Sequence, residues 1–213
     1  MRSRFDQQLD LLKSETTKMF GICEVMLHQI NDCIACANMN SKYEFGKEEN
    51  QVFNIGKEIE RMCMDMLIRQ QPVAKDLRRI SSSFKLVYNS RRIATQVIDI
   101  KDILDTMDNC NLVLDTSIIK IGQKAENQLK TSTDCLVLEK PEIAEDINDD
   151  EIDKLFQSIK TELIEKMKAN PEEGGDYANL LMIAKHYEKI GDHSENIANN
   201  SYFALTGQEF EEK

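Results

Sequence analysis

Apolar residues recur at intervals of three and four over unusually long stretches of this chain. From Phe5 to Ala37 only Thr16 interrupts the pattern, which predicts one helix of about ten turns. The 213 residues include eight Gly and three Pro, so few positions interrupt such helices. With no Trp and 6% aromatic residues, the composition disfavours a sandwich, a barrel or a doubly wound sheet. We therefore expect an all-α fold.

The same apolar spacing continues to the end of the chain and predicts six long helices. A proline restricts the residue before it and removes a backbone donor, so Pro72 ends the second helix. Pro141 suits the first position of the fifth helix. The fourth helix begins at Leu112 and weakens near 131–134. The remaining breaks fall at 108–111, at 170–175 and at Gly207.

Helix breaks and acidic residues recur after about one hundred residues, which indicates an internal duplication. Pro72 and Pro171 lie 99 residues apart, and each stands between two amphipathic helices. Glu49 and Asp149 lie 100 apart, near the starts of the preceding helices. Short connections between long helices favour antiparallel neighbours. We predict two tandem three-helix bundles, repeat 1 at 1–106 and repeat 2 at 107–206, followed by an acidic tail at 207–213.

Net charge and the absence of long apolar runs exclude several partner classes. The formal net charge of −11 disfavours binding to nucleic acid or to an anionic membrane surface. No run approaches the roughly 18 apolar residues of a spanning helix, and the charged N-terminus lacks a signal-peptide core. We expect a cytoplasmic protein without membrane insertion. In that compartment we expect its six Cys to be small apolar residues without disulfides. Cys33 and Cys36 have C-x-x-C spacing, but the second such pair that a zinc site generally needs is missing.

Charge also divides unevenly between the repeats. Residues 1–106 hold 16 basic and 15 acidic side chains, net +1, which leaves 11 and 23, net −12, for the remainder. All eight Arg lie in repeat 1. Because guanidinium groups bind carboxylates and phosphates in two-point contacts, Arg78 and Arg79 of the third helix are candidates for binding an acidic partner. The alternative is that these arginines lie on solvated helix faces and form intrahelical pairs.

Two pairs of acidic residues in repeat 2 are candidate metal ligands. Asp149 and Asp153 stand four apart at the start of the fifth helix, as do Glu188 and Asp192 in the sixth, so each pair shares a helix face. Such pairs often arise by chance among 38 acidic residues, but these two occupy neighbouring antiparallel helices and can converge. Oxygen ligands suit Mg, Mn, Fe(III) or Ca. No phosphate loop or nucleophile motif is present, so we expect no enzymatic activity.

Two longer strings connect the chain with a known family. The string QQPVAKDLR at 70–78 and the string YEKIGDHSENIA at 187–198 resemble the PhoU family of phosphate-uptake regulators, over nearly the whole chain and in two copies of its domain. The resemblance implies a non-catalytic negative regulator and a homodimer. It implies an adaptor between the ATPase of a phosphate ABC transporter and a sensor histidine kinase, held at the inner face of the membrane through these protein partners.

The resemblance also bears on the metal site. Several members bind metal ions or multinuclear clusters through E/D-x-x-x-D motifs, and the four acids of repeat 2 match those motifs. It implies iron or zinc, while Mg, Mn and Ca also suit the oxygen ligands. Repeat 1 departs from the pattern, because Arg91 and Thr95 stand at one pair of acidic positions and Glu49 with Phe53 at the other. We predict that repeat 1 binds no metal and that Arg91 pairs with Glu49.

Two other functions stay open on the sequence alone. The altered motifs of repeat 1 are compatible with an accessory protein of another transporter, such as a low-affinity phosphate carrier or another ion carrier. An enzyme with an oxygen-ligated metal cluster is the weaker alternative, because no base, nucleophile or substrate pocket is evident.

Overall fold

The computed structural model describes residues 2–36, 45–70, 72–147 and 150–210, and within these ranges all regular structure is helical. It confirms the all-α fold of two three-helix bundles. Three short 3-10 helices, η1 (Cys110–Asp115), η2 (Pro141–Asp146) and η3 (Pro171–Glu173), lie in the connections. The six α-helices are α1 (Arg2–Ala35), α2 (Gly46–Gln70) and α3 (Ala74–Thr106) in the first bundle, and α4 (Ile118–Val137), α5 (Asp150–Ala169) and α6 (Gly174–Thr206) in the second.

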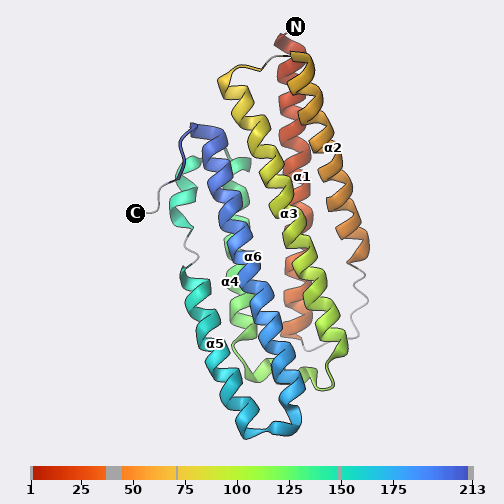
Figure 1. Ribbon diagram of the computed structural model, residues 1–213, viewed down its shortest axis with the longest axis vertical. Helices are drawn as coiled ribbons and strands as arrows, with labels where there is room; N and C mark the ends of the chain where they lie inside the picture. The colour runs from red at the N-terminus through yellow and green to blue at the C-terminus, as the bar shows by residue number, and fades with distance from the viewer. Residues whose placement is uncertain (1, 37–44, 71, 148–149, 211–213) are drawn as a thin grey trace.

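The two bundles lie side by side and share one apolar core (Figure 1). Helices α3 and α6 pack against each other at the centre, and α1 contacts α4. Side chains such as Met26 and Ile93 in repeat 1 and Ile121 and Ile190 in repeat 2 are fully buried in this common core. Burial of apolar surface therefore holds the repeats together as well as forming each of them. None of the described helices is both long enough and apolar enough to cross a membrane.

Two partly buried polar pairs join α3 to α6 and show the internal symmetry of the duplication. His193 Nδ1 lies 2.9 Å from Asn89 Oδ1, and His186 Nδ1 lies 2.7 Å from Gln96 Oε1. Asn89 and His186 are 97 positions apart, as are Gln96 and His193, so each pair is the counterpart of the other. Burial lowers the pKa of both histidines, which favours the neutral imidazole at this interface.

The connection between the repeats differs from the prediction. Leu112 lies in η1 and not in the fourth helix, which begins at Ile118. The carboxylate of Asp176, at the start of α6, accepts hydrogen bonds from the backbone N–H groups of Asp108 and Asn109 at 3.1 and 2.9 Å. This tertiary contact fixes the connection beside α6 and ends α3 before the apolar pattern resumes.

Two further expectations about repeat 2 were wrong. Helix α4 continues through 131–134, where the Thr131 and Thr133 hydroxyls donate to backbone carbonyls of the preceding turn and Thr133 also donates to Glu24. Pro141 begins the separate helix η2, and α5 starts only at residue 150. Ala144 of η2 is buried against α4 and α6, and this packing holds the segment back from joining α5.

Candidate metal centre

Three of the four predicted carboxylates converge between α5 and α6. One carboxylate oxygen from each of Asp153, Glu188 and Asp192 lies within 4.8 Å of the other two. Asp153 stands in the first turn of α5, and the other two lie one turn apart on α6. The fourth predicted ligand, Asp149, lies outside the described residues. Across those residues, no other group of three His, Cys, Asp or Glu side chains meets the same distance.

Burial distinguishes Glu188 from an ordinary surface acid. The residue is only 7% exposed, whereas Asp153 is exposed. The Oε2 atom of Glu188 is buried, and it lies 2.7 Å from Lys185 Nζ. The two groups form an ion pair, but their geometry is not that of a hydrogen bond. A buried carboxylate oxygen without a directed hydrogen bond, next to two further carboxylates, fits a hard cation that takes oxygen ligands. The residues present thus have the chemistry of a cation site.

A second lysine already supplies positive charge to this cluster. The Lys189 ammonium donates a hydrogen bond to Asp192 and lies 3.4 Å from Glu188 Oε2. The contact with Asp192 is the main cause of a raised pKa at Lys189. A metal ion bound at these three carboxylates would therefore compete with the ammonium group for the same oxygens.

The corresponding positions of repeat 1 converge in the same way with different chemistry. The Thr95 hydroxyl donates to Glu49 Oε1 at 3.5 Å, so these two positions meet across α2 and α3. The guanidinium of Arg91 lies 5.6 Å from the centre of the Phe53 ring. Only one of these four side chains, Glu49, is an acid. The guanidinium of Arg91 stands at the position that Glu188 occupies in repeat 2.

The prediction that Arg91 pairs with Glu49 was wrong, because its partner is Glu60. Arg91 Nη1 and Nη2 donate to the two carboxylate oxygens of Glu60 at 2.6 and 3.1 Å, and Nη2 also reaches the carbonyl of Phe53 at 3.3 Å. Side chains on a helix lean toward its N-terminus. Since α2 and α3 run antiparallel, Arg91 leans along α2 toward Glu60 and away from Glu49.

Sequence reasoning missed Glu60 and Gly56, although a spacing signal was present. Glu49, Phe53, Gly56 and Glu60 follow one another at intervals of four, three and four, and so occupy one face of α2. A Cβ at Gly56 would lie 2.7 Å from Arg91 Nε. The glycine leaves the space that the guanidinium fills.

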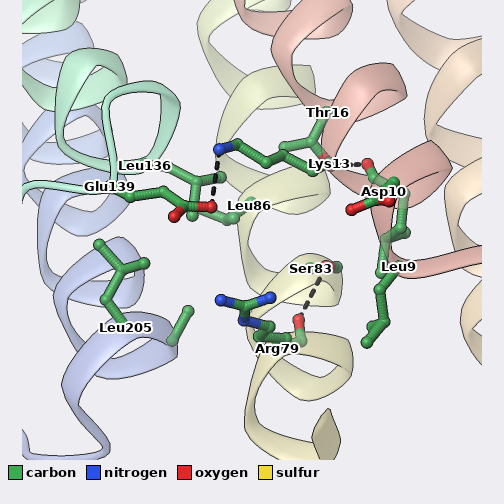
Figure 2. A pocket seen from close by; sticks show the side chains of 12 residues that line it. Leu9, Asp10, Lys13, Thr16, Arg79, Ser83, Leu86, Leu136, Glu139 and Leu205 are labelled. Carbon is green, nitrogen blue, oxygen red and sulfur yellow. Dashed lines mark hydrogen bonds and ion pairs between the residues drawn. The ribbon is translucent and has the colours of Figure 1, made fainter. Parts of the chain in front are cut away.

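The two candidate partner-binding arginines lie near the start of α3 and are both half-buried. Arg78 packs on the turn after α6, where a Cβ at Gly207 would lie 2.6 Å from its guanidinium carbon. Arg79 lines a pocket between the repeats (Figure 2). Within the described ranges neither residue forms a salt bridge, so the expected intrahelical pairs are missing at these two positions.

The cysteines do not form a thiolate site in the described part of the chain. Cys33 is buried and Cys36 is exposed, and neither is in a disulfide. Burial raises the pKa of Cys23 and Cys63 to about 12 and that of Cys135 to about 11, which disfavours the thiolate that a metal would need.

The fold and the site together define a class of protein: a duplicated three-helix bundle with a carboxylate cluster on the second repeat. The family model described as "PhoU domain" matches residues 16–104 and 118–201, one match in each bundle. The chain belongs to the PhoU family.

Curated relatives and solved structures agree with this assignment. A Clostridium acetobutylicum protein named "Phosphate-specific transport system accessory protein PhoU homolog" is 25% identical over 98% of this chain and 97% of its own length. A Caulobacter vibrioides protein of the same name is 28% identical over 96% and 91%. The crystal structure of PhoU from Pseudomonas aeruginosa superposes with a TM-score of 0.88 at 21% identity, covering 96% of this chain and all of that one. The Streptococcus pneumoniae structure, titled as a phosphate transport system regulatory protein, gives 0.75 at 19% identity over 97% and 99%.

Proposed function

We propose that this chain is a non-catalytic accessory protein that regulates phosphate transport from the cytoplasm. The observation that carries the proposal is the family match in both repeats, together with full-length relatives that are named as accessory proteins of a phosphate-specific transport system. In this role it acts as a negative regulator that links the ATPase of a phosphate ABC transporter to a sensor histidine kinase. The net charge of −11 argues against nucleic acid as a partner.

Arg78 and Arg79 are the proposed contacts with an acidic partner surface. Within the described residues neither guanidinium group forms a salt bridge with a carboxylate, which leaves their two-point donor geometry available. Co-purification from cells grown in high phosphate tests this contact. Replacing both residues with Ala should reduce recovery of the transporter ATPase and the kinase. Replacing Arg61 and Arg69, which are exposed on α2 and pair with Asp65, should leave recovery unchanged; equal recovery from the two double variants would count against the contact.

The carboxylate cluster of repeat 2 is the proposed metal site. Asp153, Glu188 and Asp192 would hold the ion, with Asp149 as the fourth ligand, and iron or zinc is the first choice, with Mg, Mn or Ca also suited to oxygen ligands. The bound ion would supply positive charge that draws the start of α5 onto α6. In repeat 1 the guanidinium of Arg91 holds α3 to α2 through Glu60, so we propose that repeat 1 needs no metal.

Elemental analysis tests the metal site directly. Wild-type protein exposed to iron, zinc or manganese and then desalted should retain metal. A variant with Asp153→Asn, Glu188→Gln and Asp192→Asn should retain little, because it keeps the shapes but loses the negative charges. Glu165→Gln is a matched control, since this acid is exposed on α5, the helix that carries Asp153, and pairs with Lys168 outside the cluster. Equal metal content in all three proteins would rule out the cluster as the site.

An accessory role for another transporter is the second candidate, whether a low-affinity phosphate carrier or another ion carrier. It is favoured by the Arg91 and Glu60 arrangement, which places a paired guanidinium at an acidic position of the family motif in repeat 1. Deleting the gene and measuring expression of phosphate-starvation genes in high phosphate separates the two. Derepression supports the phosphate regulator, and unchanged expression supports the second candidate. We also propose a homodimer, which light scattering of the purified protein tests.

A further inference from the structure

One pocket lies where the two repeats meet, at the end of the molecule that holds the starts of α1 and α3 and the ends of α4 and α6. Its cavity volume is about 60 Å³, and the cavity continues into space that is open to solvent. Five of its twelve lining residues are leucines, which come from all four helices (Figure 2). The apolar lining comprises Leu9, Leu12, Leu86, Leu136, Ala204 and Leu205.

Four charged side chains line the same pocket, and two of them neutralise each other. Lys13 Nζ donates to Glu139 Oε1 at 2.8 Å across the two repeats, and this bond is the main cause of a lowered pKa at Glu139. Arg79 forms no salt bridge within the described residues, and Figure 2 shows its guanidinium pointing into the space beside Leu205. The fourth group, Asp10, stands on the opposite wall and is exposed. The charge of Arg79 also helps to lower the pKa of Glu139, but only at longer range than a salt bridge, so Arg79 is the cation available to a ligand.

We propose that this pocket binds a small aliphatic carboxylate. The carboxylate accepts two hydrogen bonds from the Arg79 guanidinium, and the hydrocarbon chain packs among the leucine side chains. A free inorganic phosphate fits less well, because it has no apolar part and its second negative charge is repelled by Asp10. The same chemistry is offered by a free fatty acid and by the C-terminal leucine of a peptide. The inference uses Arg79, which is also one of the two proposed partner contacts, but its test requires neither the transporter nor the kinase.

Calorimetric titration of the purified full-length chain tests the proposal with defined probes: acetate, hexanoate, octanoate, octanol, inorganic phosphate and N-acetyl-leucine. Binding should strengthen from acetate to octanoate by up to about fourfold for each methylene that becomes buried. Octanol should bind at least about tenfold more weakly than octanoate, because it cannot pair with the guanidinium. N-acetyl-leucine separates the two sources. Tighter binding than hexanoate assigns the pocket to a peptide C-terminus, and weaker binding assigns it to a free fatty acid.

Substitutions then assign the carboxylate to one residue. Arg79→Gln should weaken octanoate binding by about tenfold or more. Arg92→Gln, at an exposed arginine on the same helix outside the pocket, should leave it unchanged. Circular dichroism confirms that both variants fold. The proposal is overturned if neither hexanoate nor octanoate binds saturably, if Arg79→Gln binds octanoate as tightly as wild type, or if phosphate binds more tightly than octanoate.

Discussion

Replacing Arg91 with Met should destabilise the protein by about 2 kcal/mol, because Met keeps much of the apolar stem but removes the guanidinium. An exposed ion pair contributes about 0–1 kcal/mol, and breaking a fully buried one costs about 3–5 kcal/mol. The Arg91 and Glu60 side chains are 19% and 37% exposed, so the carboxylate left behind is partly solvated and the expected loss lies between these limits. With a urea m-value of roughly 3 kcal/mol/M for a chain of this size, the unfolding midpoint should fall by about 0.7 M.

A double-mutant cycle separates the ion pair from other effects of the substitution. Glu60→Gln alone and combined with Arg91→Met should give a coupling free energy of about 1–2 kcal/mol. Arg92→Met, at an exposed arginine of the same helix, should change stability by less than about 0.5 kcal/mol. A coupling below about 0.5 kcal/mol, or an equal loss in the Arg92 variant, would refute the argument that this guanidinium holds α3 to α2.

Three further predictions follow from individual contacts. Gly122→Ala should destabilise by about 1–2 kcal/mol, because its Cβ would meet the Asn31 amide oxygen at 2.7 Å and the fully buried Tyr187 ring at 3.0 Å. By contrast, the Cβ of Gly21→Ala meets nothing, so this substitution should stabilise by up to about 1 kcal/mol; urea midpoints that shift in the same direction would contradict this. Lys189→Met should raise the affinity for zinc or manganese by about three- to tenfold in a calorimetric titration, because it removes the competing ammonium; unchanged or weaker affinity would show that the lysine does not compete. The pKa of His186 and that of His193 are lowered in the folded protein, so the unfolded chain takes up protons first and stability should fall as the pH drops from about 7 toward 5. Replacing both with Asn should flatten this dependence in urea unfolding at several pH values, and an unchanged slope would contradict it.

The number and type of the helices could be predicted because each buries a stripe of apolar residues with helical spacing. The connections could not, because tertiary contacts decide them. Residues 110–115 are apolar enough to begin a helix, but the Asp176 carboxylate holds the backbone just before them. Burial of Ala144 similarly separates η2 from α5. Local pattern carries no information about either contact.

The convergence of acids on α5 and α6 was predictable because residues four apart share a helix face and adjacent helices in a bundle pack together. The lysine contacts within the cluster were not considered, although Lys185 and Lys189 are only three residues and one residue from acids of the site. The partner of Arg91 was missed for a different reason. Spacing on α2 offers both Glu49 and Glu60, and only the direction of the side chain along an antiparallel neighbour selects between them.

Repeat 1 has not simply lost metal ligands, because several of its differences from repeat 2 depend on one another. A guanidinium between α2 and α3 needs both space and a counter-charge, and Gly56 and Glu60 supply them. One hundred positions later the same face of α5 carries Phe156 and Lys160. Phe156 instead packs under the Lys185 ammonium, 5.1 Å from the ring centre, so repeat 2 has neither the space nor the carboxylate that an arginine would need. Repeat 1 therefore carries its cation as part of the chain, whereas Glu188 and Asp192 of repeat 2 pair with lysines, which an ion bound at the proposed site would have to displace. If both repeats had kept their acids, an ion would tighten both bundles at once. With this arrangement, binding of an ion would change only the contact between α5 and α6.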